Sequence, residues 1–178
     1  AIFKLADGYN CAENSFLQSI CSVLPNVTQT LLREHYRCHP TIINFCNQRF
    51  YGGKLVIMTE DHGEDDVMMA KKTKPGEYVR KYDLHSTGKE RKFNYREIEV
   101  VRDELLQDLS ADADIGIITP YNGQVEHFSD VIPIEVATIH KYQGREKDII
   151  IMSTVDDQIS EFCDNTNLIN VAISRAKN

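Results

Sequence analysis

Apolar residues recur at helical spacing in the first third of the chain and predict two amphipathic helices. The first helix ends before Pro25, which cannot continue a helix. Its apolar face consists of Phe16, Leu17, Ile20, Val23 and Leu24. The second helix begins at Pro40, a residue suited to the first helical position, and ends before Gly52 and Gly53. Its apolar face consists of Ile43, Cys46 and Phe50. Between the two helices, residues 28–33 alternate weakly and predict a short strand.

The pattern is weakest between residues 56 and 92 and becomes clear again from Asn94. Residues 59–66 and 71–77 are charged and predict loops, whereas residues 77–84 predict a strand. Asn94 is a good N-cap, and Glu97 follows at the third position, so the pair resembles a capping box. The helix that follows is expected to run to about Leu109. Its apolar stripe consists of Ile98, Val101, Leu105 and Leu109.

Short apolar runs in the last third of the chain predict strands that alternate with helices. Strands are expected over residues 115–119, 135–138 and 148–152, and helices over residues 124–128 and 168–176. The third strand contains three consecutive isoleucines, as is typical of a strand covered on both faces. The alternation predicts an α/β fold with a doubly wound, mainly parallel sheet flanked by helices.

Composition and charge narrow the class of protein. The chain has 178 residues, of which 42% are hydrophobic, enough for one domain with a substantial core. It has no apolar run of membrane-spanning length and no secretory leader, so we expect a cytoplasmic protein without a membrane partner. The net charge of −7 argues against a stand-alone nucleic-acid binder, although a few neutral groups and backbone amides can still hold a strand.

The ends of the chain and its cysteines add two expectations. The chain begins at Ala1 without a start signal and ends just after a Ser-Arg-Ala-Lys run. We therefore expect residues 1–178 to be a single domain from a larger protein, truncated at both ends. The five cysteines have neither a disulfide-framework spacing nor a zinc-site spacing, and we expect free thiols.

Four polar segments follow predicted strands, where ligands bind in open parallel sheets. They are residues 34–40, 119–124, 138–148 and 170–177. In this order they resemble motifs of the second RecA-like domain of superfamily 1 helicases. Residues 36–40, Tyr-Arg-Cys-His-Pro, are similar to a Tyr-Arg-Met-His-Pro motif of that family. Gln-Gly-Arg-Glu-Lys-Asp resembles motif V, and Asn-Val-Ala-Ile-Ser-Arg-Ala-Lys resembles motif VI. The Gly-Arg-Glu-Lys-Asp form favours the branch that contains the nonsense-mediated-decay helicase.

The resemblance implies a nucleotide site. ATP is expected between two RecA-like domains, with Mg²⁺ held mainly by the other, N-terminal domain. Arg37 and Arg175 match the family arginines that reach the γ-phosphate, a role that suits a permanently charged, forked guanidinium. Tyr36 matches the position that packs on adenine, and Glu146 matches one near the ribose. Gly144 fits a tight turn where the backbone approaches a ligand.

Each of these residues also has an ordinary structural interpretation. Either arginine could form a salt bridge with a neighbouring acid. Tyr36 could be a core tyrosine, Gly144 an ordinary turn glycine, and Glu146 the partner of Arg145 or Lys147 in a surface ion pair.

The resemblance also implies contacts with single-stranded nucleic acid. The expected residues are Thr119, Tyr121, Asn122 and Thr138, with His140 and Gln143 between strand and nucleotide. Hydroxyls and amides hold phosphates without reading sequence, and an aromatic ring stacks on any base. The two threonines could instead simply end their strands.

Three further patterns are weaker, and no metal site is expected. Asp103 and Glu104 follow helical spacing, so they are expected on a solvated helix face rather than at a magnesium site. The acidic run Glu60, Asp61, Glu64, Asp65 and Asp66 with His62 is expected to be a loop rather than a metal nuclease centre. The zinc-type residues His35, Cys38, His39 and Cys46 lack paired-cysteine spacing.

The phosphate-binding motif Gly-x-x-x-x-Gly-Lys-Ser/Thr does not occur in the sequence. The expected function is therefore the second motor domain of an ATP-dependent helicase, active only together with its N-terminal RecA-like domain. The alternative is a catalytically inactive helicase-like interaction domain. The presence of both Arg37 and Arg175 favours the motor.

Overall fold

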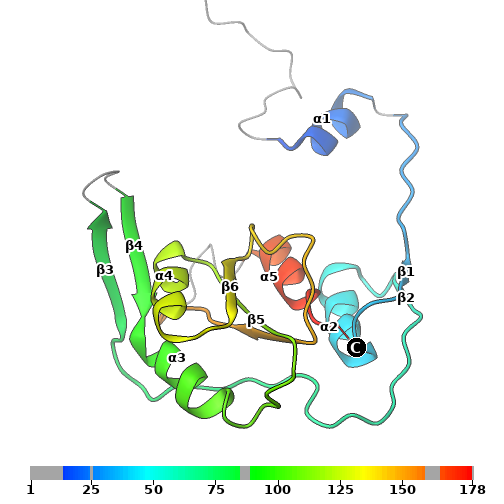
Figure 1. Cartoon of the computed structure of the whole chain (residues 1–178). Coiled ribbons are helices and arrows are strands. Elements are labelled where there is room, and N and C mark those ends of the chain that lie inside the picture. The colour runs from blue at the N-terminus through cyan, green and yellow to red at the C-terminus, as the bar shows by residue number, and fades with distance from the viewer. Residues whose placement is uncertain (1–13, 25, 85–88, 159–164, 178) are drawn as a thin grey trace, which may run out of the picture. The chain divides into compact units, whose positions relative to one another are not determined.

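A computed structural model describes residues 14–24, 26–84, 89–158 and 165–177 of the chain (Figure 1). The chain divides into two compact units, Ala1–Leu32 and Arg33–Asn178. Among the described residues, no helix is both long enough and apolar enough to cross a membrane.

The first unit contains one described helix, α1 (Phe16–Val23), which confirms the first predicted helix. Its start is fixed by a capping box between Ser15 and Gln18, in which each side chain bonds to the other residue's backbone N–H. The strand predicted over residues 28–33 is wrong, because residues 27–33 have no regular secondary structure. The nearest strand is the two-residue β1 (Glu34–His35) of the second unit.

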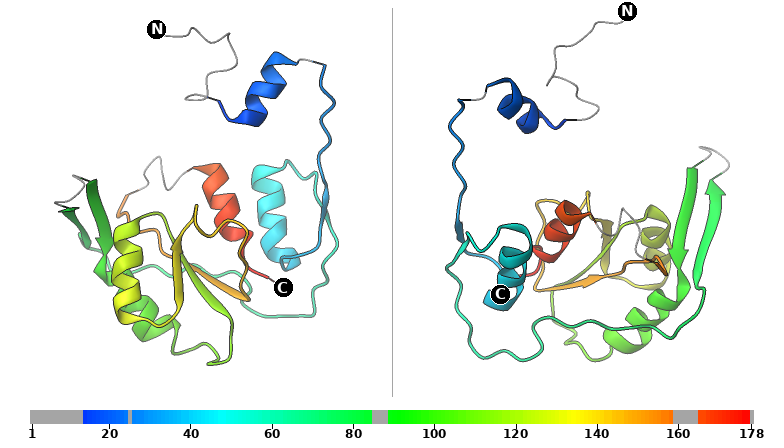
Figure 2. Two further views of the ribbon diagram at one scale, coloured as in Figure 1. Left: turned by 45° about the horizontal axis from the view of Figure 1, so that its top comes forward. Right: turned by 180° about the vertical axis from the view of Figure 1, so that it is seen from behind.

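The centre of the second unit is a parallel three-stranded sheet with the order β6–β5–β7 (Figure 2). Its strands are β5 (Ile115–Thr119), β6 (Glu135–Thr138) and β7 (Ile149–Met152), as predicted. The register places Thr119 beside Thr138, so the carboxyl ends of β5 and β6 coincide. Segments that leave these strands therefore gather at one edge of the sheet.

Helices cover both faces of this sheet. Ile117 of β5 packs with α4 (Asn122–Val131) and with the helix that begins at Tyr95. The next residue, Ile118, lies on the opposite face and packs towards α5 (Thr166–Ile173). Successive residues of a strand point to opposite faces of the sheet. Because helices cover both faces, Ile117 and Ile118 are both completely buried. The predicted α/β fold with flanking helices is confirmed.

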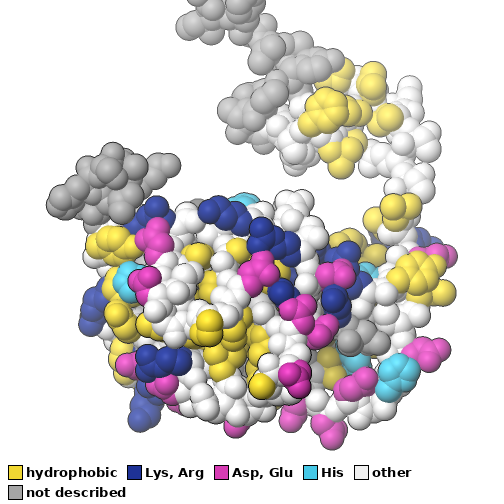
Figure 3. Space-filling model, viewed as in Figure 1, with side chains coloured by type: hydrophobic (Ala, Val, Ile, Leu, Met, Phe, Trp, Pro, Cys, Tyr) yellow, Lys and Arg dark blue, Asp and Glu magenta, His cyan; other side chains and the backbone are white. Residues whose placement is uncertain are grey.

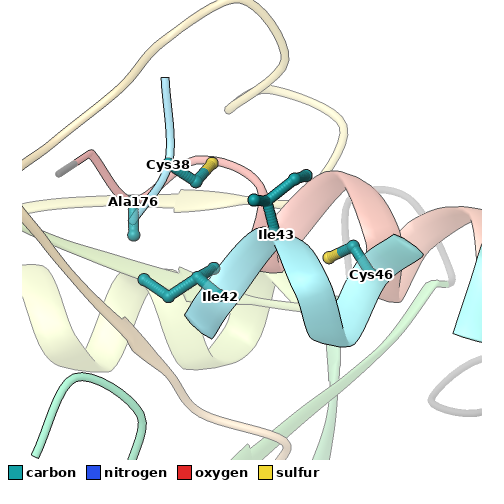
Figure 4. Packing of buried hydrophobic residues seen from close by; sticks show 5 residues of the cluster. All are labelled: Cys38, Ile42, Ile43, Cys46 and Ala176. Carbon is teal, nitrogen blue, oxygen red and sulfur yellow. The ribbon is translucent and has the colours of Figure 1, made fainter. Parts of the chain in front are cut away.

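A third hydrophobic cluster joins α2 (Pro40–Phe50) to the end of α5 (Figure 4). Its buried members are Cys38, Ile42, Ile43, Cys46 and Ala176. Helix α2 begins at Pro40 as predicted, and Gly52 and Gly53 follow its end with positive φ angles of 59° and 75°. The chain then forms β2 (Val56–Ile57), which pairs in parallel with β1. The loops predicted over residues 59–66 and 71–77 are confirmed.

An antiparallel hairpin forms from β3 (Val79–Leu84), which was predicted, and β4 (Lys89–Asn94), which was not. Phe93 is the buried anchor of the hairpin, and its ring stacks on His127 of α4 at a centroid distance of 3.8 Å. Tyr82 of β3 donates a hydrogen bond from its hydroxyl to Glu126, also on α4. The hairpin is thereby attached to the outer side of α4.

The helix after the hairpin differs from the prediction. It consists of α3 (Tyr95–Val100) and a π-helical turn, η1 (Val101–Leu105), and so ends before Leu109. The Asn94 side chain accepts a hydrogen bond from Glu97 N, as predicted. The second hydrogen bond of a capping box, from the Asn94 N–H to the Glu97 carboxylate, is not formed, so this part of the prediction is wrong. The Asn94 N–H donates to Gln124 instead, and the Glu97 carboxylate binds the segment after β7.

Candidate functional site

Three segments that lie far apart in the sequence converge at the start of α2. The Cys38 thiol is completely buried and contacts the Ser174 carbonyl at 3.5 Å. Next to it, Arg37 forms an ion pair of 2.9 Å with Glu146 from the loop before β7. The Lys147 N–H donates to the Arg175 carbonyl, and the Lys177 N–H donates back to Lys147. This parallel bridge holds the segment after α5 against the loop that carries Glu146.

Arg175 is half-buried at the end of α5, and its guanidinium is held by its own helix. Its Nε donates to the Val171 carbonyl at 3.0 Å, and one terminal nitrogen donates to Ser174 Oγ at 3.1 Å. Burial, and after it the charge of Arg37, lowers the pKa of Arg175. Among the residues that the structure describes, no carboxylate forms an ion pair with Arg175. Positive charge here is therefore incompletely compensated, which favours binding of an anion.

The same charges act on the Cys38 thiol. Burial raises its pKa to about 11, against the lowering effect of the two arginines. The thiol is therefore neutral at physiological pH and adds no negative charge to the pair.

Glu146 is an exposed carboxylate beside Arg37 and Lys177. It pairs with Arg37, and Lys177 Nζ lies 3.9 Å from its other oxygen. The alternative of an ion pair with Arg145 or Lys147 is wrong, because both of these residues pair with Glu135 instead.

Tyr36 and Gly144 are both exposed, and each is close in the chain to a residue of this site: Tyr36 precedes Arg37, and Gly144 precedes Glu146 by two residues. The Tyr36 side chain is 65% exposed, so the alternative of a core tyrosine is wrong. Its hydroxyl donates a hydrogen bond to Glu34, which raises the pKa of Tyr36. Gly144 has a φ of 87°, a left-handed conformation that favours glycine, in an exposed loop.

The residues expected to contact single-stranded nucleic acid lie at the carboxyl ends of strands β5 and β6, but they differ in exposure. Asn122, His140 and Gln143 are exposed. Thr119 and Thr138 are buried. A direct contact of either hydroxyl with nucleic acid would therefore require the chain to move. Their carbonyls accept from Ile139 N and Tyr142 N, which fixes the turn after β6. In this conformation the two threonines end their strands.

Tyr121 is half-buried, and its partners were missed by the sequence analysis. Its hydroxyl donates to Asp156 Oδ2 at 2.6 Å, and Lys92 Nζ lies 4.9 Å from the centre of its ring. Asp156 follows β7, so it lies at the same carboxyl edge, a position that the strand pattern could have indicated. Lys92 comes from the hairpin, and no local pattern links it to Tyr121.

The surface here is not a continuous basic face. Figure 3 shows basic and acidic side chains mixed over the viewed side of the molecule. Acidic residues pair with basic ones elsewhere on the surface as well: Asp103 and Glu104, which lie on a solvated helix face as predicted, pair with Arg102 and Lys71. Any contact of this face with nucleic acid would therefore rest on a few placed groups rather than on a basic patch.

His39 approaches two acids of the loop after β2, yet the geometry does not suit a metal ion. His39 Nε2 lies 3.6 Å from Asp61 and 3.4 Å from Glu64. The other ring nitrogen, Nδ1, accepts from Thr41 N as the cap of α2. Because Nδ1 accepts, the neutral ring carries its proton on Nε2, which then faces the carboxylates as an N–H group and not as a metal ligand. His35 is likewise occupied, because its Nε2 accepts from Cys38 N.

Comparison with known proteins gives relatives over nearly the whole chain. Residues 12–178 match the family described as AAA domain. The chain is 32% identical to an uncharacterized ATP-dependent helicase of Caenorhabditis elegans over 82% of its length. It is 32% identical to helicase sen1 of Schizosaccharomyces pombe over 83%, and 30% identical to the DNA replication ATP-dependent helicase/nuclease DNA2 of Gallus gallus over 82%. The chain spans only 11%, 10% and 15% of these relatives, respectively.

Proposed function

Because the chain belongs to the AAA domain family, which has a RecA-like P-loop NTPase fold, we propose that it is the second motor domain of a superfamily 1 helicase. In this proposal the parent protein moves along single-stranded nucleic acid at the expense of ATP. The nucleotide lies between this domain and an N-terminal RecA-like domain of the same protein, which holds the phosphate loop and most of the Mg²⁺ coordination. The Gly-Arg-Glu-Lys-Asp segment, which resembles motif V, is the reason to propose the branch that contains the nonsense-mediated-decay helicase.

The observation that carries the proposal is the meeting of Arg37 and Arg175 around Cys38. After burial, the charge of Arg37 is the main cause that lowers the pKa of Arg175, so the two guanidinium groups repel each other. Among the described residues, the carboxylate that pairs with Arg37 is that of Glu146. Repulsion between the two guanidinium groups destabilises the folded domain where it is not offset by negative charge. A polyphosphate bound between them converts the repulsion into attraction, because each guanidinium can donate two parallel hydrogen bonds to phosphate oxygens.

The two arginines then have distinct tasks. Arg175 is held by Val171 and Ser174, so it can present a fixed charge to the γ-phosphoryl group as charge redistributes in the transition state. Arg37 is exposed and paired with Glu146, so it can exchange that carboxylate for phosphate. Glu146, once released, can accept hydrogen bonds from the ribose hydroxyls.

Tyr36 and Gly144 complete the nucleotide side of the proposal. The exposed Tyr36 ring offers a face for adenine, and the left-handed turn at Gly144 lets the backbone pass close to the nucleotide. On the strand side, Tyr121 is proposed to stack on a base, while Asn122, His140 and Gln143 offer hydrogen bonds to the backbone of the strand. Thr119 and Thr138 are proposed to act by fixing these loops.

The test compares this chain with the longer protein that carries it. The chain alone should not hydrolyse ATP, whereas the longer protein should, with stimulation by single-stranded DNA or RNA. Turnover by the isolated chain would contradict the half-site assignment. A longer protein that binds its partners but never hydrolyses ATP would support the inactive interaction domain instead.

A further inference from the structure

The turn that follows β7 is held in an unfavourable conformation. Val155 has a φ of 70°, in the left-handed region that β-branched residues rarely adopt, and its side chain is completely buried. Such a conformation costs on the order of 1–3 kcal/mol and persists only where its surroundings enforce it. Strain of this kind is often found beside functional groups.

The start of α3 supplies the restraint. The Val155 N–H donates to both oxygens of the Glu97 carboxylate at 3.0 Å, and the Val155 carbonyl accepts from Asn94 Nδ2 at 2.9 Å. Ser153 donates to the same carboxylate and accepts from Gln124 of α4. Both polar groups of the Val155 backbone are therefore fixed by residues of other elements.

The strained turn places Asp156 at the carboxyl edge of the sheet. The Asp156 side chain is only 8% exposed. One of its oxygens accepts from Lys92 Nζ at 2.8 Å, and the other accepts from the Tyr121 hydroxyl at 2.6 Å. Lys92 also lies over the Tyr121 ring, so the ring is restrained at its edge and on its face.

We infer that Asp156 is a positioning residue for strand binding: its carboxylate, with Lys92 as counter-ion, holds the Tyr121 ring in the orientation that stacks on a base. The inference rests on the proposed function. Stacking alone does not need a hydroxyl, because a phenylalanine ring offers the same face. A ring that is already fixed loses less rotamer freedom when the nucleic acid binds, so the entropic cost of binding is smaller and the affinity is higher.

A purely structural role for the same contacts makes a different prediction. A buried ion pair that only stabilises the fold changes the unfolding transition when it is broken, but leaves the strand affinity of the folded protein unchanged. A positioning role changes that affinity under conditions where the variant is fully folded.

The experiment measures the affinity of the longer protein for a fluorescent single-stranded homopolymer of thymidine or uridine, by anisotropy well below the melting temperature. Tyr121→Phe and Asp156→Asn should each weaken binding about threefold to tenfold, the effect expected from freeing one side chain. The double variant should bind like the single variants, because both remove the same contact. Tyr121→Ala should weaken binding further.

A matched control is available on the hairpin. The Tyr82 hydroxyl donates to the Glu126 carboxylate at 2.6 Å, the same kind of bond as that of Tyr121, on the outer side of α4. Tyr82→Phe should therefore leave strand affinity unchanged.

The outcomes separate the inference from the proposed function. If Tyr121→Ala weakens binding while Tyr121→Phe and Asp156→Asn do not, the strand contact stands and the positioning role is wrong. If Tyr121→Ala binds as tightly as the parent, the strand contact itself is wrong and the inference falls with it. If Asp156→Asn does not fold, Tyr121→Phe decides alone, since it leaves the Asp156–Lys92 pair in place.

Discussion

Replacement of Glu97 by glutamine should destabilise the chain by about 2–3 kcal/mol. The carboxylate accepts from Ser153 Oγ at 2.5 Å and from Val155 N at 3.0 Å, and Thr154 Oγ1 lies at 3.3 Å. All three groups donate to the carboxylate here, and the Val155 N–H, which bonds to both of its oxygens, can only donate. Glutamine keeps one acceptor oxygen, so it loses at least one of these hydrogen bonds and the hydroxyls must reorient, and a donor left unsatisfied costs about 1–3 kcal/mol. The loss of charge on the remaining hydrogen bond accounts for the rest.

The measurement is urea denaturation of the 178-residue chain, followed by circular dichroism, with Glu99→Gln as the control. Glu99 lies on the same helix, and its ion pair with Arg96, at 3.3 Å, is partly exposed, so removal of the Glu99 charge should change the free energy of unfolding by less than about 1 kcal/mol. If Glu97→Gln is as stable as Glu99→Gln, the network at Val155 does not restrain the turn, and the reasoning is refuted.

Four further predictions concern the core. Gly116→Ala should destabilise strongly, because a Cβ there would lie 1.8 Å from the Tyr142 hydroxyl, and Tyr142→Phe in the same chain should recover part of the loss in thermal denaturation. Tyr142→Phe alone should not destabilise, because that buried hydroxyl has no hydrogen-bond partner among the described residues. Burial raises the pKa of Cys38 and of Cys46 from 9.0 to about 11, so both thiols should alkylate more slowly at pH 8 than half-buried Cys21, measured by mass spectrometry of the peptides. Because the unfolded chain ionises these thiols first, stability should fall between about pH 9 and 11, and a flat free energy of unfolding over that range would contradict their burial.

The parts of the fold that could be predicted are those whose signal is local. Strands β5 and β6 were predicted with the observed bounds because short apolar runs are bounded by polar residues. Strand β4 was missed because four of its six residues are charged, and its one buried apolar side chain, Phe93, packs on a helix about thirty residues later. The end of the helix after Asn94 was misplaced because apolar spacing continues to Leu109, while the backbone turns away after Leu105.

The site was predictable to a similar extent. Motif order indicated that Arg37, Glu146 and Arg175 belong together, and the structure brings these three residues into one region. The strand pattern could have placed Asp156 at the same edge of the sheet as Tyr121, but not the strained turn that aims its carboxylate at the Tyr121 hydroxyl, 35 residues away. Lys92 could not be predicted as a partner, because it reaches Tyr121 from a hairpin, 29 residues away. Contacts of this kind depend on how distant elements pack, and no regular spacing of residues in the sequence reveals them.

Arg175 is the residue on which the account depends most directly, and one pair of measurements on the longer protein tests it. Arg175→Ala should lower ATP turnover at saturating single-stranded nucleic acid by roughly 10³–10⁵, the effect of a placed arginine in nucleotide hydrolases. Binding of a fluorescent ATP analogue should stay within about tenfold, or ~1.4 kcal/mol, because the other domain's phosphate loop supplies most of the affinity. Arg175→Lys should restore little, since a point charge does not reproduce the planar fork. Turnover near the parent rate in Arg175→Ala would show that Arg175 is structural and would contradict the motor assignment.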